Sequence, residues 1–234
     1  MGVGQQLPLP LGLDPQYTFE RFFPGPNEEV LELLKRAALG SGAMPLLIHG
    51  PHASGKTHLL QASCAMAGGR GLSAMTLPLR VLINQGTQSI DGLGAFDCIC
   101  LDDLDCAVGN SAWEEALFLL FNTLYDRQAQ LIVAASKPPA DLPFVLEDLR
   151  SRMSSGPIVA LKPLGETESM EALIGHASAL GLEMTEAVAQ YLVRRVDRNL
   201  GSLLRHLDHL DRASMAASRK LTIPFIRTVL DAAS

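Results

Sequence analysis

The apolar positions of this chain fall into short runs that alternate with longer stretches of helical spacing. The short runs predict five β-strands, at residues 44–50, 72–78, 96–104, 131–135 and 157–161. Helical spacing predicts the helices between them, at 57–67, from Leu79 onward and at 111–127. Strands that alternate with helices form parallel sheets with right-handed crossovers, so this part of the chain is predicted to be an α/β domain.

One more helix is predicted before the first strand. Asn27 is placed to cap its first turn, because a side-chain oxygen there can accept from a free backbone N–H. Its buried stripe is predicted to consist of Val30, Leu31, Leu33 and Leu34.

After Lys162 only helical spacing remains. It predicts four helices, at 166–180, 184–196, 199–217 and 222–232. The predicted organisation is an extended tail at 1–14, a three-layer αβα domain with a parallel sheet at 15–163, and a small all-helical lid domain at 164–234.

The tail contains QLPLPL at residues 6–11, where leucine and proline alternate. Proline fixes φ and lacks a backbone donor, so this stretch is neither helix interior nor central strand. Two interpretations remain open from composition. The leucines occupy an apolar groove of a partner, or the arm folds back on its own domain or pairs with a second copy.

Composition excludes several classes of protein. The net charge of −6 over 234 residues argues against unaided binding to nucleic acid, which depends on clustered Lys and Arg. No apolar run is long enough to span a bilayer, and prolines with no basic residue before Arg21 exclude a secretory signal. The four cysteines show no C-x-x-C spacing, so a reduced, cytoplasmic protein without membrane attachment is expected.

The segment GPHASGKT at 50–57 matches the phosphate-binding P-loop pattern at every fixed position, between a predicted strand and a predicted helix. Backbone N–H groups of such a loop surround phosphate oxygens, and the helix N-terminus adds its dipole. Lys56 is expected to reach the β- and γ-phosphates, and the Thr57 hydroxyl to bind Mg²⁺. The expected nucleotide-binding residues are Gly50, Pro51, His52, Ala53, Ser54, Gly55, Lys56, Thr57 and His58.

A second motif follows the third predicted strand, where apolar residues lead into Asp102 and Asp103. With the P-loop it forms a Walker B segment, in which Asp102 holds the metal and Asp103 orients or deprotonates the attacking water. The guanine-reading motif is absent after the fourth strand, so by exclusion the nucleotide contains adenine. Ser136 either senses the γ-phosphate there or begins a Pro-rich turn.

Two arginines lie just before the fifth strand, in LEDLRSRMSSG at 146–156. Arg150 and Arg152 either form surface ion pairs with Glu147 and Asp148, or one of them serves as an arginine finger toward the nucleotide of a neighbouring subunit. Sequence alone leaves both interpretations open.

Taken together, these motifs resemble the AAA+ ATPases of the DnaA branch, and within it the DnaA-related proteins that regulate bacterial replication initiation. The resemblance covers nearly the whole chain and rests on QLPLPL at 6–11, YTFERFFPGPN at 17–27, GPHASGKTHLLQA at 50–62, CLDDLDCAVGNSAWEEALFLLFN at 100–122, LEDLRSRMSSG at 146–156 and LDHLDRASMAASRKLTIPFI at 207–226. The first and last segments distinguish this family, because the P-loop and Walker B motifs are shared by a very large superfamily.

The resemblance implies an AAA+ P-loop NTPase fold and a negative regulator of replication initiation. Such proteins bind ADP or ATP with Mg²⁺, dock on the DNA-loaded sliding clamp of DNA polymerase III, and stimulate ATP hydrolysis by DnaA. DNA is then reached only indirectly, in a nucleoid- or replisome-associated protein. A homo-oligomer through the tail or the finger surface is a further expectation.

The same resemblance implies roles for individual residues. Arg152 is the finger toward the ATP of DnaA, Arg150 is the second choice, and Ser136 is sensor 1. The residues implied to surround the adenine are Tyr17, Phe19, Phe22 and Pro24. The residues implied to contact the clamp are Gln6, Leu7, Leu9 and Leu11.

One position departs from the family pattern. Gly201 stands where related ATPases have the sensor 2 arginine; Arg198 or Arg205 remains open as a substitute, although neither has the matching register. We therefore expect weak or no intrinsic hydrolysis. Two other functions remain as alternatives, a self-sufficient homo-oligomeric ATPase that acts as a loader or remodeller, and an adaptor whose nucleotide is only structural.

Overall fold

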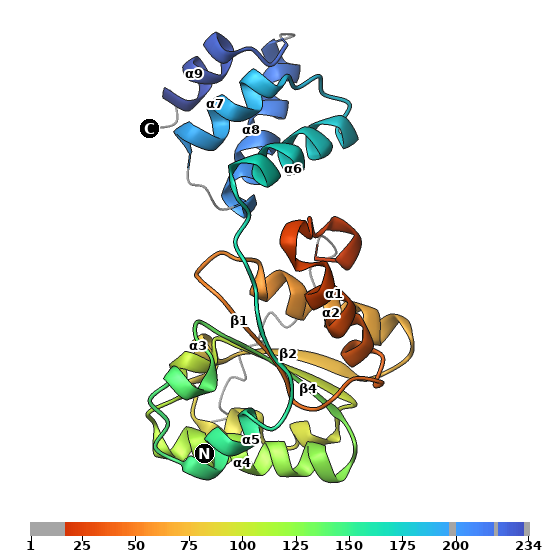
Figure 1. Cartoon of the computed structure of the whole chain (residues 1–234), viewed down its shortest axis with the longest axis vertical. Coiled ribbons are helices and arrows are strands. Elements are labelled where there is room, and N and C mark those ends of the chain that lie inside the picture. The colour runs from red at the N-terminus through yellow and green to blue at the C-terminus, as the bar shows by residue number, and fades with distance from the viewer. Residues whose placement is uncertain (1–16, 197–199, 218–219, 232–234) are drawn as a thin grey trace, which may run out of the picture. The chain divides into compact units, whose positions relative to one another are not determined.

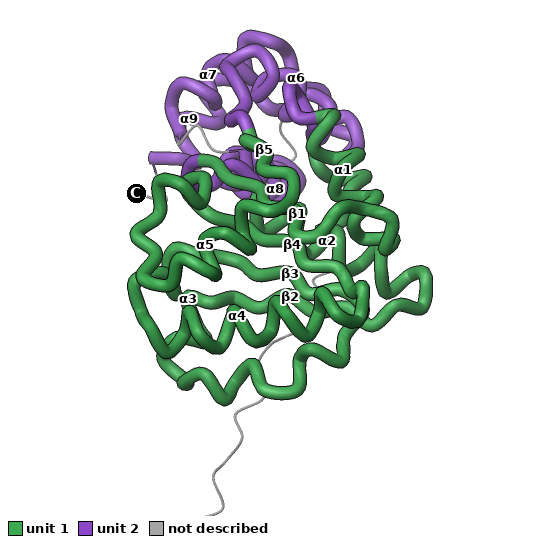
Figure 2. The backbone as a smooth tube through the Cα atoms, turned by 60° about the horizontal axis from the view of Figure 1, so that its bottom comes forward, with its two compact units in different colours: residues 1–22, 28–50, 56–161 green, residues 23–27, 51–55, 162–234 purple. Residues whose placement is uncertain are grey.

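The computed structural model describes residues 17–196, 200–217 and 220–231, so the tail residues predicted to bind the clamp, as well as Arg198, lie outside the described residues. The chain divides into two compact units (Figure 2). The first comprises residues 1–22, 28–50 and 56–161, and the second comprises 23–27, 51–55 and 162–234. The short segments 23–27 and 51–55 are thus grouped with the helical unit, although they lie within the predicted αβα range.

A five-stranded parallel sheet forms the centre of the first unit (Figure 1). The strands are β1 (Leu46–His49), β2 (Ala74–Pro78), β3 (Cys98–Asp102), β4 (Gln130–Ala135) and β5 (Ile158–Ala160). Their spatial order is β2-β3-β4-β1-β5. The predicted α/β class with a parallel sheet is confirmed.

Helices cover both faces of this sheet (Figure 1). On one face lie α1 (Glu28–Ala38) and α2 (Lys56–Gly69), and on the other lie α3 (Leu79–Leu82), α4 (Ser111–Asp126) and α5 (Glu147–Met153). Alternate residues of each strand face the two layers, as in β3, where Cys98 and Cys100 face α2 while Ile99 and Leu101 face α4. The inner strands β1, β3 and β4 are therefore buried on both sides, as is usual in a parallel sheet.

Short 3₁₀ turns link several of these elements. They lie at Phe19–Arg21, Gly25–Asn27, Thr87–Ile90, Leu93–Ala95, Leu104–Cys106 and Pro139–Asp141.

Two local features differ from the sequence-based expectations. Asn27 does not cap α1; its carboxamide donates to Lys162 O at 2.9 Å and accepts from Lys162 N at 2.8 Å. Residues Glu147–Met153 form helix α5, which the sequence did not predict. Only Leu149 and Met153 of that helix are buried, and two apolar positions are too few to create a visible period.

The second unit is a helical bundle of α6 (Glu166–Ala179), α7 (Glu186–Arg195), α8 (Leu200–Ala217) and α9 (Ile223–Asp231). One face of α8 lies in its core, where Leu203, Leu207 and Leu210 are buried and Leu204 is partly buried. The predicted small all-helical lid is confirmed. No helix within the described ranges is long and apolar enough to cross a membrane.

Candidate nucleotide site

The P-loop connects β1 to α2 at the carboxyl edge of the sheet. Neighbouring strands end at the same edge, since β4 pairs with both β1 and β3. Asp102 ends β3 and Ser136 follows β4, so the two Walker motifs and Ser136 belong to one edge. In parallel sheets with crossover helices, this edge is where ligands bind.

The P-loop backbone is shaped to present N–H groups. Ala53 and Gly55 have left-handed torsions, with φ values of 59° and 94°. Loops with alternating handedness direct successive N–H groups into one concavity, which suits an anion. The Ser54 hydroxyl oxygen is buried and has no hydrogen-bond partner among the described residues. This hydroxyl is therefore available to donate a hydrogen bond to an oxygen atom of a bound ligand.

Lys56 begins α2, and its ammonium donates to Gly50 O at 2.8 Å. Burial lowers the pKa of Lys56, although the carboxylates of Asp102, Asp103 and Asp105 act in the opposite direction. A partly desolvated cation beside a loop of N–H groups gains interaction with an added phosphate.

Thr57 and Asp102 form the candidate metal-binding pair. The Thr57 hydroxyl donates to Asp102 Oδ2 at 2.6 Å, and Asp102 is 5% exposed. Burial raises the pKa of Asp102, while the hydrogen bond from Thr57 lowers it. An oxygen pair of this kind suits Mg²⁺, which binds to few protein ligands and keeps several waters. The residues present therefore fit the predicted metal.

The side chain of Asp103, the next residue, has a different partner. Asp103 has a left-handed φ of 56°, and its carboxylate accepts from Arg80 Nε at 2.9 Å. Arg80 belongs to α3, immediately after β2. The carboxylate predicted to activate water is thus engaged in an ion pair that sequence reasoning did not anticipate, because the partners are 23 residues apart.

Ser136 is similarly engaged. Its backbone N–H donates to Asp105 Oδ2 at 2.8 Å, and its hydroxyl donates to Asp105 Oδ1. The predicted sensor hydroxyl is therefore directed to the loop after β3. The run of acids D-D-L-D at 102–105 was the available signal for Asp105.

Aromatic residues surround His58 near the start of α2. Its ring meets Tyr17 at 5.1 Å and Phe22 at 5.3 Å between centroids, both edge to face, and its Nε2 donates to Thr18 O at 2.8 Å. Burial lowers the pKa of His58. Phe19, predicted to line the adenine, is 5% exposed and packs in the core against α1 and α2.

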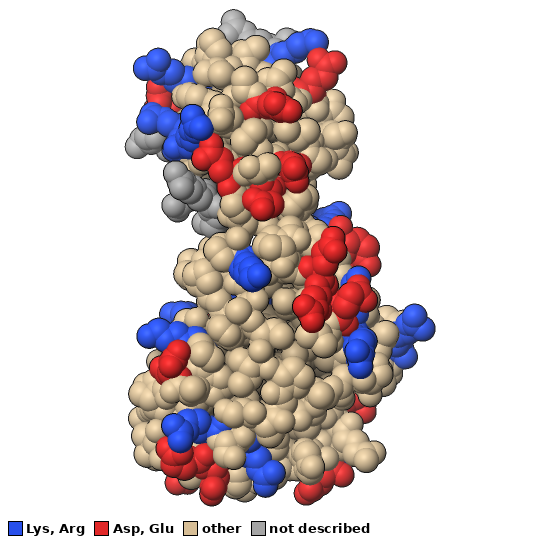
Figure 3. Space-filling view, in the orientation of Figure 1, with Lys and Arg blue, Asp and Glu red and all other residues tan. Residues whose placement is uncertain are grey.

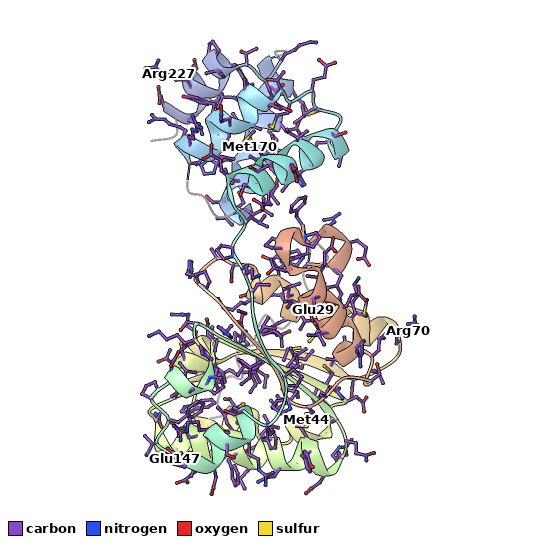
Figure 4. The ribbon with its side chains drawn as sticks, in the orientation of Figure 1. Glu29, Met44, Arg70, Glu147, Met170 and Arg227 are labelled. Atoms are coloured by element: carbon purple, nitrogen blue, oxygen red, sulfur yellow. The ribbon has the colours of Figure 1, made fainter. Side chains whose placement is uncertain are left out.

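The two candidate finger residues differ in their partners. Arg150 forms an ion pair with Glu147, whose place at the start of α5 is labelled in Figure 4. The Arg152 guanidinium lies over the ring of Phe121, 5.6 Å from its centroid, and has no acidic partner among the residues that the structure describes. Both side chains are exposed. Arg152 therefore presents the uncompensated charge.

The lid contributes a separate feature near the sensor 2 position. Gly201 is exposed on α8, and Arg205, one turn later, lines a hollow of about 500 Å³ together with His206 and His209. On the face of the molecule in Figure 3, acidic side chains gather around α1, whose first turn carries Glu28 and Glu29.

Comparison with known families agrees with this geometry. The family model for the bacterial DnaA ATPase domain matches residues 13–71 and 81–160, more than half of the chain. The model for the lid domain of Hda matches residues 166–230.

Solved structures share the fold of this chain. Domain III of the Thermotoga maritima replication initiation protein DnaA superposes with a TM-score of 0.80 at 24% identity, covering 94% of this chain and 98% of that one. AMPPCP-bound DnaA from Aquifex aeolicus has a TM-score of 0.73 at 27% identity, covering 85% and 66%. The RuvB branch migration motor of Thermotoga maritima, with a TM-score of 0.69 at 18% identity over 94% and 72%, shares the fold.

Proposed function

Because the chain belongs to the bacterial DnaA ATPase family and carries an Hda-type lid, we propose that it is a negative regulator of replication initiation that stimulates ATP hydrolysis by DnaA. In this proposal it binds ADP with Mg²⁺, docks on the DNA-loaded sliding clamp, and supplies Arg152 to the ATP of DnaA. Its own hydrolysis is weak.

The P-loop geometry supports nucleotide binding. Lys56 and the N–H groups around Ala53 and Gly55 hold the phosphates, while Thr57 and Asp102 hold Mg²⁺. The metal neutralises charge on the phosphates when bound. The DnaA homologue that contains AMPPCP makes adenine the expected base.

Weak intrinsic hydrolysis follows from two contacts. Hydrolysis needs a carboxylate that orients water and a polar group that contacts the γ-phosphate. Asp103 pairs with Arg80, and Ser136 donates to Asp105, so both groups are occupied within this chain. With Gly201 at the sensor 2 position, the site holds ADP rather than turning over ATP.

The observation that carries the finger assignment is the exposed guanidinium of Arg152 over Phe121. A finger must be solvent-exposed, held in direction, and free of an internal counter-ion, so that it stabilises charge on the phosphates of another subunit. Arg152 meets these requirements among the described residues, whereas Arg150 is already paired with Glu147.

Clamp docking is assigned to the tail. Gln6 anchors it by hydrogen bonds, and Leu7, Leu9 and Leu11 enter an apolar groove. The prolines limit the freedom of the unbound segment, which lowers the ordering cost of binding. The tail brings the chain to DNA, which its net charge of −6 does not favour directly.

The test of the finger compares Arg152→Ala with Arg150→Ala as its matched control. Hydrolysis by DnaA-ATP is measured with the purified full chain, clamp and DNA of the same species. Arg152→Ala should lower the stimulation by about 10³-fold while ADP and clamp binding persist, because a finger contributes about that factor or more. Arg150→Ala should retain the stimulation.

Other results would favour the alternatives. Undiminished stimulation by Arg152→Ala would make the chain an adaptor. Fast hydrolysis by the chain alone, with no effect on DnaA, would make it a self-sufficient ATPase.

The tail has its own test. Replacing Gln6 and Leu7 by Ala should abolish clamp binding in a pull-down and leave ADP affinity unchanged. Clamp affinity that survived this replacement would assign the leucines to the fold or to self-association.

A further inference from the structure

Glu114 is a buried carboxylate with an unusual set of partners. Its side chain lies in the first turn of α4 and is fully buried. It accepts from the backbone N–H of Gly109 at 2.7 Å, of Val145 at 3.0 Å and of Leu146 at 2.6 Å. A buried carboxylate is costly unless such donors surround it, so the three N–H groups are part of the fold at this point.

The donors come from two separate segments of the chain. Gly109 lies in the loop after β3 that follows the Walker B acids, and Val145 and Leu146 precede α5. Leu146 is the N-cap residue of α5, and its own side chain makes no capping hydrogen bond. The Glu114 carboxylate therefore holds the start of α5, although its partner Val145 lies 31 residues after it in the chain.

The same helix α4 also contacts the other end of α5. Phe121 lies seven residues after Glu114, about two helical turns, and so on the same face of α4. The Arg152 guanidinium lies over the Phe121 ring. Leu149 and Met153 anchor α5 in the core between these two contacts.

We infer that Glu114 is a positioning residue for Arg152. It holds the start of α5 so that the guanidinium over Phe121 keeps one direction toward the partner's ATP. This inference rests on the proposed function of Arg152. Apolar anchoring by Leu149 and Met153 fixes how deeply α5 is buried, and the carboxylate fixes its orientation through hydrogen bonds that demand a particular geometry.

The test is Glu114→Gln, with Glu115→Gln as its control. Glu115 is the next residue of α4, is exposed, and undergoes the same chemical change. In Glu114→Gln, the side-chain N–H₂ replaces one of the two carboxylate oxygens, so a donor stands where an acceptor was. At least one of the backbone N–H groups that donate to Glu114 then faces another donor. Hydrogen exchange over 145–153 should therefore become faster in Glu114→Gln and stay unchanged in Glu115→Gln.

The kinetic readout separates positioning from a general structural role. When DnaA-ATP is titrated with the chain, Glu114→Gln should lower the maximal stimulated rate at least tenfold. It should leave the half-saturating concentration and the affinity for ADP unchanged. Equal losses of ADP affinity and stimulated rate, or an undiminished rate with faster exchange, would overturn the inference.

Two further variants keep the result decisive. If Glu114→Gln does not fold, Glu114→Asp keeps the charge but shortens the reach, and should show the same faster exchange and lower rate; unchanged values would again overturn the inference. Arg152→Ala is measured beside them. If Arg152→Ala still stimulated hydrolysis by DnaA, the proposed function itself would be overturned. If Arg152→Ala lost the stimulation but the Glu114 variants kept it, only the positioning role of Glu114 would be overturned.

Discussion

The Thr57 hydroxyl donates a 2.6 Å hydrogen bond to the buried carboxylate of Asp102, which joins the first turn of α2 to the end of β3. The P-loop and the Walker B strand are thereby held in contact by the two groups expected to bind Mg²⁺.

Thr57→Ala should weaken ADP binding in the presence of Mg²⁺ and leave it nearly unchanged in EDTA. The loss should be about tenfold, since a hydrogen bond or ligand contact to a charged group contributes about 1.5 kcal/mol. Fluorescent ADP titrations measure both affinities. Thr57→Ser keeps the hydroxyl and should bind normally; an equal loss with and without Mg²⁺ would contradict the assignment.

Lys56→Ala should remove the thermal stabilisation that ADP provides. At about 100 times the dissociation constant, a ligand stabilises the native state by about 2.7 kcal/mol, which a melting curve readily detects. The control is Lys35→Ala, which breaks an exposed pair with Glu32 on α1. If ADP raised the melting temperature of the Lys56 variant as much as that of the unmodified chain, the nucleotide would bind elsewhere.

Arg80→Gln should raise the intrinsic rate of ATP hydrolysis severalfold. The change removes the positive charge and the guanidinium whose Nε donates to Asp103 Oδ2 at 2.9 Å, and glutamine is too short to take its place, so the carboxylate can turn toward an attacking water. Arg70→Gln, on the exposed residue that follows α2 and is labelled in Figure 4, is the control and should hydrolyse ATP at the original rate. An unchanged rate in Arg80→Gln would mean that the ion pair does not limit hydrolysis.

The stability of the chain should fall on acidification below about pH 6.5. Burial lowers the pKa of both His58 and His49, so the native state keeps these rings neutral while the unfolded state takes up protons first. The stabilisation is complete above the unfolded pKa and is lost as the pH falls through the lower native values.

His58→Gln tests this in thermal melts between about pH 7.5 and 5.5, a window around the unfolded histidine pKa. Glutamine keeps a donor for Thr18 O but does not titrate, so the melting temperature should fall less than in the unmodified chain. Combination with His49→Asn should flatten the dependence further. A fall as steep as that of the unmodified chain would assign the acid sensitivity to other groups.

Much of the fold could be predicted from local spacing. The apolar runs of β1 and β3, and the position of GPHASGKT between a strand and a helix, are patterns within a few neighbouring residues. The leucine spacing of α8 is equally local, and Leu203, Leu207 and Leu210, which recur at helical spacing, are buried.

The candidate site was predictable only in part. The chemistry of Lys56, Thr57 and Asp102 follows from residue type and motif. The engagement of Asp103 by Arg80 and of Ser136 by Asp105 does not, because these contacts join loops at the ends of different strands. Their existence depends on the order in which β2, β3 and β4 pair, and the sequence pattern does not encode this order.

By itself, the sequence determined an α/β domain with a P-loop, a Walker B strand and a helical lid, because periodicity and motif spacing act over short chain distances. Only the tertiary structure decided that α5 exists, that Asn27 joins Lys162, and that Glu114 meets the N–H groups before α5. These features depend on hydrogen bonds between distant segments, and packing brings those donors and acceptors together.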